Sequence, residues 1–447
     1  MNNSNSTKDY NSIVWIQNIR SGWGHAKLKW LANIFSGGTP NTNVDEYWVN
    51  GTIPWLNSGS VNQKRITTAS NHITELGLAS SSAKWVPKGA ILMALAGQGK
   101  TKGTVAILEI DATCNQSMAS IIPNDEKMYN VYLFYWLELN YERIRGLAGT
   151  ESRDGLNLGI LGDIYCPVPS MQDQIQIALF LDHQCNIIEE LIQKKERQVN
   201  LLQQLREATI NEVVSMGLNP KVKFKNSGIE WLEKIPSHWE ILKIKNIATA
   251  YGRIGYRGYT TEDIVGENEG AVTISPSNIA GDFMSFENCT YIKWEKYDES
   301  PEIQIYNNDI LMVKTGSTYG KTGIVKNLSK KATINPQLLV FKNIKINPDY
   351  LFNLLRTPLI KNQVETCVIG STIPTISQSK ILNFQIVLPP INEIEEIMLF
   401  IRATTSQIDS ISSLIKQQID NLKEYRQSLI SEAVTGKIDV REWQPSN

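Results

Sequence analysis

The segment ALAGQGKTKG, which begins at Ala94, has the spacing of a phosphate-binding loop. It fits the pattern [AG]-x4-G-K-[ST], in which a strand leads through a glycine-rich turn into a helix whose first amides hold phosphate. The residues that follow, GTVAILEI, instead alternate Val105 and Ile107 as a second strand would. The sequence therefore predicts a β-hairpin at this position, and no bound nucleotide.

A second stretch that could support chemistry is NPDY at 347–350, which is similar to the N-P-P-Y motif that holds the target amine in adenine methyltransferases. The stretch departs from that motif at Asp349, and no F-x-G-x-G cofactor loop accompanies it. Asn347 followed by Pro348 is instead the expected cap and first residue of a helix. We therefore interpret NPDY as a helix start.

Other catalytic and metal-binding patterns are missing from the sequence. No serine, cysteine or histidine arrangement suggests a nucleophile, and the acidic residues form no P-D…(D/E)-x-K nuclease signature. The five cysteines make no C-x-x-C pair and the four histidines lie far apart, which is typical of a reducing compartment and indicates no metal site. We predict a chain with no catalytic residue, no metal and no cofactor of its own.

Two stretches carry lysines without any acidic residue. Residues 310–345 contain seven lysines and residues 84–108 contain four. Lysines beside glycine-rich turns suit contacts to phosphates and base edges, and YGRIGYRGYT at 251–260 is a second basic and aromatic candidate; the alternative is a set of solvated hairpins. The predicted DNA-contacting residues are Gln98, Lys100, Thr101, Lys102, Arg253, Tyr256, Arg257, Lys314, Ser317, Thr318, Tyr319 and Lys321.

Length and composition indicate a multidomain globular protein. The 447 residues suggest two or three domains, and 42% hydrophobic with 20% charged residues excludes a disordered chain. No apolar run is long enough to span a bilayer, so we expect a cytoplasmic protein. The net charge of −1 means that DNA binding would depend on local patches or on a partner's charge.

The chain repeats itself with a period of about 220 residues, as a duplicated domain does. ILMALAGQGKTKG at 91–103 matches ILMVKTGSTYGKTG at 310–323, and the second copy lacks the nucleotide-binding pattern. YLFYWL at 132–137 matches YLFNLL at 350–355. The segments that begin at Pro169 and Pro389 align without a gap. Each copy is therefore expected to be a globular part followed by a long helix.

Apolar residues in both long segments recur at steps of three and four, as in the seam of a coiled coil. Two equal units packed about a pseudo-twofold axis would place the two helices antiparallel. We count the first helix from Ile175 to Met216, with Gly217 and Gly436 after the two helix ends. The predicted fold is α+β, with two globular α/β domains joined by two long antiparallel coiled-coil helices. Seam positions include Leu181, Ile188, Leu202, Ile408, Ile415 and Leu422.

The order and duplication of these motifs resemble the specificity subunit of type I restriction-modification systems. GTIPWLNSGSVN at 51–62 is similar to an early strand motif of that family, and WLEKIPSHWE at 231–240 to the opening of its second target-recognition domain. RQSLISEAVTGKIDV at 426–440 is similar to its C-terminal helix end. The resemblance covers nearly the full chain. The first copy departs at Met216, where the second has Gly436.

The resemblance implies a non-catalytic subunit in which each globular domain recognises half of a split, asymmetric site in double-stranded DNA and the helices set the gap. It implies target-recognition domains at 1–168 and 218–388, and helical regions at 169–217 and 389–440. It also implies two modification subunits with S-adenosylmethionine, docked on the helices that carry the six seam residues, and two restriction subunits that use ATP and magnesium. Alternatives are a methylation-only or type IIB-like complex, and a scaffold that binds no DNA; the duplication leaves no room for a fused catalytic domain.

Overall fold

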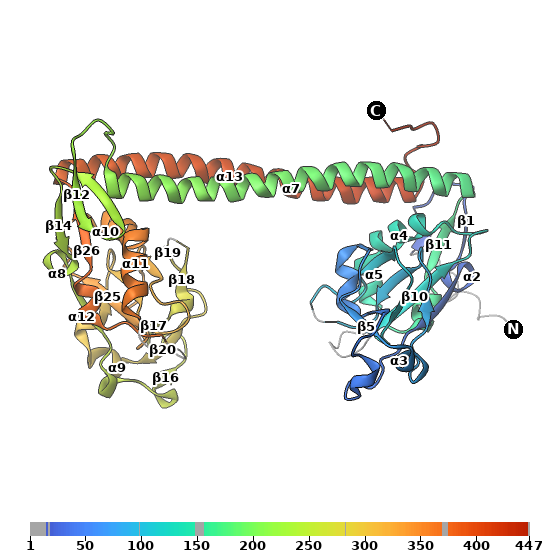
Figure 1. Ribbon diagram of the computed structural model, residues 1–447, viewed down its shortest axis with the longest axis horizontal. Coiled ribbons are helices and arrows are strands. Elements are labelled where there is room, and N and C mark those ends of the chain that lie inside the picture. The colour runs from blue at the N-terminus through green and yellow to red at the C-terminus, as the bar shows by residue number, and fades with distance from the viewer. Residues whose placement is uncertain are drawn as a thin grey trace. The chain divides into compact units, whose positions relative to one another are not determined.

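The computed structural model describes residues 15–16, 18–97, 99–147, 156–281, 283–368 and 374–445. The chain divides into two compact units, each with one globular domain and part of each of two long helices (Figure 1). Unit 1 consists of Met1–Glu196 and Lys416–Asn447, and unit 2 of Arg197–Ile415.

The two long helices are α7 (Met171–Met216) and α13 (Ile391–Val434). At 46 residues, α7 is about 69 Å long. It begins four residues before the predicted start at Ile175, because Ser170 caps it: the amide of Asp173 donates to Ser170 Oγ, which donates to the Asp173 carboxylate. Each helix is followed by a glycine with positive φ. This backbone conformation lets amides beyond the helix end donate to the last helical carbonyls.

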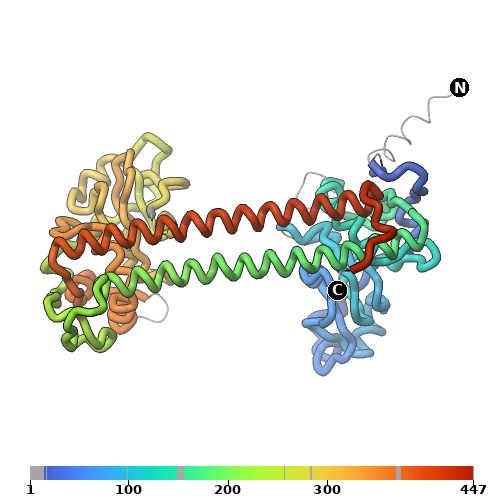
Figure 2. The backbone as a smooth tube through the Cα atoms, turned by 90° about the horizontal axis from the view of Figure 1, so that it is seen from above, coloured from blue at the N-terminus to red at the C-terminus, as the bar shows by residue number. Residues whose placement is uncertain are grey.

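Within each unit, the parts of α7 and α13 run side by side in opposite directions (Figure 2). In unit 1, Gln176 near the start of α7 donates to the carbonyl of Trp443, beyond the end of α13, and Lys195 donates to Gln418. In unit 2, Arg206 lies 3.5 Å from Asp409. The predicted α+β fold with antiparallel long helices is confirmed.

Unit 1 contains two main sheets and a two-stranded ribbon. The five-stranded sheet has the order β2 (Ala32–Ser36), β10 (Met118–Pro123), β7 (Ile91–Ala94), β8 (Val105–Leu108), β4 (Arg65–Ile66). The four-stranded sheet has the order β5 (Asn71–Ile73), β3 (Ile53–Leu56), β9 (Ala112–Cys114), β6 (Trp85–Val86). The ribbon pairs β1 (Gly24–Lys27) with β11 (Tyr165–Val168).

Unit 2 repeats these sheets and adds short edge strands. The six-stranded sheet has the order β15 (Thr249–Gly252), β25 (Leu338–Lys342), β22 (Ile310–Val313), β23 (Thr322–Ile324), β19 (Phe283–Met284), β18 (Ile279–Ala280). The five-stranded sheet has the order β16 (Ile264–Val265), β20 (Thr290–Lys293), β17 (Gly270–Ile274), β24 (Ala332–Ile334), β21 (Gln304–Ile305). The ribbon β14 (Glu240–Lys243) with β26 (Gln385–Leu388) corresponds to β1 with β11, and β12 (Phe224–Ile229) pairs with β13 (Leu232–Pro236).

Short helices cover the sheets of each unit. In unit 1 they are α2 (Leu28–Leu31), α3 (Glu75–Ala79), α4 (Asn130–Leu139), α5 (Tyr141–Gly146) and α6 (Leu158–Gly162). In unit 2 they are α8 (Ile244–Ile247), α9 (Trp294–Asp298), α10 (Pro348–Leu355), α11 (Pro358–Cys367) and α12 (Gln378–Leu382).

In each globular domain, a tyrosine forms a hydrogen bond to a carbonyl at the end of a long helix. Tyr132 on α4 donates its hydroxyl to the carbonyl of Val434, and Tyr350 on α10 donates to the carbonyl of Val214. Both tyrosines are fully buried, and burial raises their pKa well above its usual value. The repeat noticed in the sequence thus corresponds to the same anchoring contact in both units.

Candidate nucleic-acid interface

Each unit presents a glycine-rich hairpin. A backbone hydrogen bond from another segment of the same unit holds each hairpin where its first strand ends. Hairpin 1 (residues 91–108) contains β7 and β8, and hairpin 2 (residues 310–324) contains β22 and β23, each as an antiparallel pair. The amide of Leu156 donates to the carbonyl of Leu95 in unit 1. At the matching place in unit 2, the amide of Ile376 donates to the carbonyl of Lys314. The hairpin predicted at 94–103 is therefore confirmed.

The turn of hairpin 1 is fixed through the carbonyl of Lys100. The hydroxyl of Tyr141 donates to this carbonyl at 2.6 Å, and Thr104 Oγ1 donates to it at 2.9 Å. The Lys100 side chain remains exposed, while Thr101 and Lys102 are half-buried. Gln98 lies outside the described residues. This geometry holds one predicted lysine at the tip of a constrained turn.

The same geometry argues against nucleotide binding, because the residues after the turn form β8 and no helix opens there to present its amides to phosphate. We expect titration calorimetry of ATP into the isolated chain to give no saturable heat. Lys100→Ala is expected to leave the trace unchanged. Micromolar binding that disappears in this variant would contradict the prediction.

Hairpin 2 brings most of its predicted residues to one cavity. Ser317, Thr318, Tyr319 and Lys321 line a cavity of about 550 Å³ together with residues of α11. The matching cavity in unit 1, about 540 Å³, lies between hairpin 1 and the α4–α5 corner and includes Lys100. Sequence reasoning missed other residues on these walls, which include Lys64, Tyr141, Lys361 and Glu365. They lie far from the hairpins in sequence, so no local motif marks them.

The structure places Arg253 inside unit 2. Its side chain is 4% exposed, and its guanidinium donates to the carbonyl of Ile334, to Thr333 Oγ1 and to the carbonyl of Arg257. Burial lowers its pKa. Arg253 supports the fold and is not presented for contact with DNA. Arg257 lies 3.5 Å from Glu302 and is half-buried, and the side chain of Tyr256 is outside what the structure describes.

The stretch of lysines without acids is partly neutralised in three dimensions. Lys326 pairs with Asp349 at 3.0 Å, and Lys330 pairs with Glu267 at 2.9 Å. Lys342 pairs with Asp309 at 2.8 Å. Within the described residues Lys314 and Lys321 have no ion pair.

Lys314 and Lys321 differ in their surroundings. Lys321 is exposed at the hairpin tip. Lys314 is half-buried with its ammonium beside Gly252, where an added Cβ would lie 3.0 Å from Nζ, and burial lowers the pKa of Lys314. Lys321 is thus the more accessible cation of the two.

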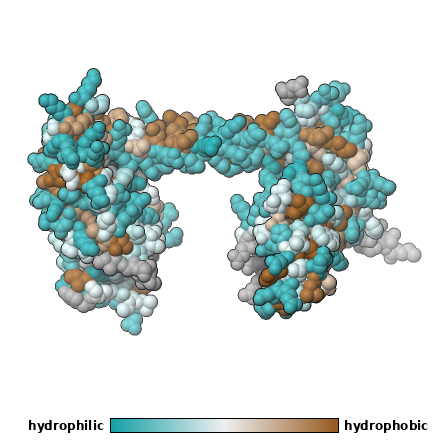
Figure 3. Space-filling view, in the orientation of Figure 1, coloured by the Kyte–Doolittle hydropathy of each residue, from teal (hydrophilic) through white to brown (hydrophobic). Residues whose placement is uncertain are grey.

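The six seam residues mark the two helices that were predicted to bind the modification subunits. Leu181, Ile188 and Ile408 are buried, and Leu202, Ile415 and Leu422 are half-buried. Since side chains at coiled-coil positions pack against the opposite helix, a partner would contact mainly the outward faces of the two helices. Figure 3 shows apolar surface along the helices. The exposed apolar side chains of α7 and α13 include Leu201, Leu205, Leu399, Leu414 and Tyr425.

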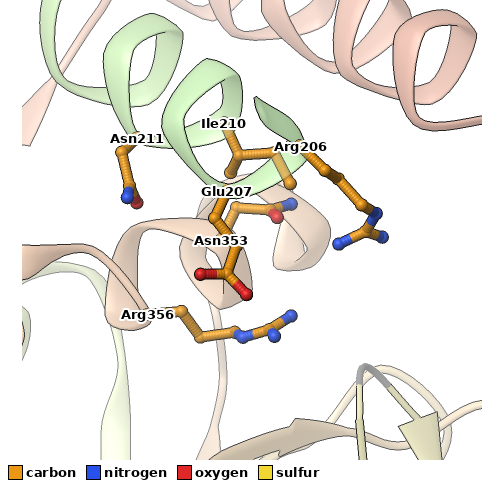
Figure 4. Close-up of a pocket in the computed structure, with 6 residues that line it drawn as sticks. All are labelled: Arg206, Glu207, Ile210, Asn211, Asn353 and Arg356. Atoms are coloured by element: carbon orange, nitrogen blue, oxygen red, sulfur yellow. The ribbon is translucent and has the colours of Figure 1, made fainter. Parts of the chain in front are cut away.

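The contact between the globular domain and a long helix involves different charged residues in the two units. In unit 1, Arg426 of α13 donates to both carboxylate oxygens of Glu138 at 3.0 Å, and both side chains are largely buried. Arg356 replaces the glutamate at the matching position of unit 2. There Glu207 of α7 points toward Arg356 across a cavity of about 210 Å³ that Arg206 also lines (Figure 4).

The NPDY stretch is a helix start, as predicted. Asn347 caps α10, and its side chain accepts hydrogen bonds from the amides of Asp349 and Tyr350, with Pro348 as the first helical residue. Asp349 pairs with Lys326 and with Arg402 of α13. Across the described residues, no group of histidine, cysteine and carboxylate side chains has the arrangement of a metal site. No described helix is long and apolar enough to cross a membrane.

This geometry defines a duplicated, two-domain protein in which each copy carries a constrained basic hairpin and a long helix. The chain belongs to the family described as type I restriction modification DNA specificity domain, whose model matches residues 20–201 and 236–423. The match covers both copies of the repeat. The chain is thus a specificity subunit of a type I restriction-modification system, which is a non-catalytic subunit.

Known proteins similar to the chain agree with this family. The MjaIX specificity subunit of Methanocaldococcus jannaschii is 25% identical over 96% of this chain and 96% of its own length. The EcoKI specificity subunit of Escherichia coli K12 is 18% identical over 96% of this chain and 92% of its own length.

Solved structures share the fold. A chain from the structure on complex assembly and conformational transition of the type I R-M system aligns with a TM-score of 0.71 at 15% identity, covering 94% of this chain and 99% of that one. The HsdS subunit of Thermoanaerobacter tengcongensis aligns with a TM-score of 0.50 at 14% identity, covering 94% and 98%.

Proposed function

We propose that this specificity subunit selects the DNA site of its complex, with each globular domain recognising one half of a bipartite, asymmetric sequence. The long helices set the spacer between the halves and dock the modification subunits. S-adenosylmethionine belongs to the modification subunits, and ATP and magnesium belong to the restriction subunits. Two copies of each partner match the duplication of this chain.

The observation that supports this proposal is a shared scaffold with different side chains at the tips. Hairpin 1 and hairpin 2 occupy the same place in sheets of the same order, and equivalent backbone hydrogen bonds hold both. Their tips differ, because Gly-Lys-Thr-Lys at 99–102 is replaced by Ser-Thr-Tyr-Gly-Lys at 317–321. Since base recognition depends on the side chains that reach the groove, two such tips would recognise two different half-sites.

The test uses a DNA library in which both half-sites and the spacer vary. It measures DNA retention by the full chain with and without its modification subunit, and methylation by the complex. We expect the complex to methylate one bipartite sequence. Exchanging the hairpin 2 tip should change one half-site and leave the other unaltered. Retention of no DNA in either condition would contradict the proposal.

The exposed lysines at the two tips give a prediction about salt dependence. We propose that Lys100 and Lys321 contact phosphates, so alanine at either position should weaken binding to all sequences alike and lower the salt slope by about one unit. Arg253→Ala is the contrasting variant. Because the guanidinium of Arg253 is buried, we expect its loss to impair folding and not to remove a phosphate contact. Binding isotherms from 50 to about 200 mM salt would measure the slope. A change of base preference at a single position, with the slope retained, would contradict the phosphate assignment.

A further inference from the structure

The C-terminal segment of the chain covers one aromatic residue of α7. The indole of Trp443 contacts the ring of Phe180, with centroids 5.2 Å apart and planes at 82°, and lies 5.3 Å from the ring of His183. Gln176 holds the segment by donating to the carbonyl of Trp443 at 2.6 Å. As a result Phe180 is only 8% exposed.

The repeat places Phe400 of α13 at the position of Phe180. The two helices align without a gap from Pro169 and Pro389, so Leu179 and Phe180 correspond to Leu399 and Phe400. Within unit 2, Phe400 is 40% exposed and Leu399 is 65% exposed. Phe400 and Leu399 are therefore exposed in unit 2, whereas in unit 1 the indole of Trp443 covers the equivalent phenylalanine, Phe180.

The charges around the two phenylalanines also differ. Ile175 and Gln176 on α7 are replaced by Glu395 and Glu396 on α13. Both glutamates are exposed, and neither has an ion pair within the described residues. In unit 1 the segment that carries Trp443 also carries Arg441, whose pKa is raised mainly by Asp439 and to a smaller extent by Asp173 in the first turn of α7. Arg402 stands where unit 1 has Asp182, but it pairs with Asp349 at 3.4 Å, so the two glutamates leave negative charge beside Phe400 that would attract such a segment.

From this comparison we infer that Phe400, Leu399, Glu395 and Glu396 form a docking site for a partner segment that carries an aromatic side chain next to lysine or arginine. The occupant is a modification subunit, and this step rests on the proposed function. Trp443 of the chain itself fills the equivalent site in unit 1. The two modification subunits therefore bind with unequal affinity. One binds more tightly at the open site of unit 2. The other binds more weakly at unit 1, where it must displace Trp443 or do without the aromatic contact.

The experiment titrates purified modification subunit against the full-length chain and follows the species with one and two modification subunits by native mass spectrometry. The wild type should show two separate binding steps. Phe400→Ser should weaken the tighter step by about tenfold or more, since a partly buried aromatic anchor dominates such contacts. Trp443→Ser should strengthen the weaker step by about threefold or more, because the site is no longer occupied. Gln176→Ala, which loosens the segment without removing an aromatic ring, should act in the same direction.

Ile264→Ser is the matched control, because Ile264 is 45% exposed on the globular domain of unit 2, and both steps should remain as in the wild type. Two steps that all variants leave unchanged would overturn the inference and leave the proposed function standing. A wild type that binds no modification subunit would overturn both. Self-association of the chain that is lost in Phe400→Ser and in Trp443→Ser alike would assign the site to a second copy, and would also overturn the inference.

Discussion

Lengthening both long helices by four residues is expected to lengthen the preferred DNA spacer by one to two base pairs. The insertions are placed after Glu196 in α7 and after Ile415 in α13, where the chain passes from one unit to the other. Each unit then keeps all of its own helix contacts. Four residues advance a helix by about 6 Å and about 400°, so the apolar seam nearly returns to its face. At about 3.4 Å per base pair, this advance corresponds to one to two base pairs.

Two inserted residues at the same places serve as the control. They rotate the following part of each helix by about 200°, which moves the seam away from its partner, and specific methylation should be lost. The measurement is methylation of a DNA library in which only the spacer length varies. If the four-residue variant remains active at the original spacer, the helices do not determine the gap.

Glu138→Gln is expected to destabilise unit 1 by about 2 to 4 kcal/mol in the free energy of unfolding, because it leaves the buried guanidinium of Arg426 without its carboxylate. The Arg426 and Glu138 side chains are 14% and 18% exposed, so water replaces the lost interaction poorly. Because two units need not unfold together, the effect is best measured by hydrogen exchange of α4 against α10. Exchange should accelerate in α4 and stay constant in α10.

A surface pair provides the matched control for this prediction. Glu190 lies 3.9 Å from Lys194 on α7, and both side chains are more than 70% exposed. Glu190→Gln should therefore change stability by less than about 0.5 kcal/mol. The double variant Glu138→Leu with Arg426→Met should recover much of the lost stability, since a well-packed apolar pair can replace a buried ion pair. Equal effects of Glu138→Gln and Glu190→Gln would show that burial of the pair contributes nothing.

Features that depend on neighbouring residues in the sequence could be predicted. The alternation after Thr101 distinguished a hairpin from a phosphate-binding loop, and the order Asn347–Pro348 marked a helix start. The internal repeat was more powerful, because two copies of one fold must satisfy the same contacts twice. It predicted the long antiparallel helices, although the cap at Ser170 was missed.

Features that depend on distant residues could not be predicted from local patterns. Arg253 stands beside glycines and tyrosines, as a contact residue would, but the strand that accepts its hydrogen bonds is Thr333–Ile334, far along the chain. Lys326 lies in a stretch without acids, and its partner Asp349 comes from a helix outside that stretch. Charge counted along a sequence therefore overestimates the charge that a folded surface presents.

Unit 1 is assembled from both ends of the chain, whereas unit 2 is a single continuous segment, Arg197–Ile415. The amide of Arg20 donates to the carbonyl of Thr435, Trp23 packs against Gly436, and Tyr132 needs the carbonyl of Val434. During synthesis on the ribosome, unit 2 therefore has all of its residues before unit 1 does. The first domain can be completed only after Lys416–Asn447 have been made, so a message cut short before these residues would yield an intact second domain and an unfinished first one.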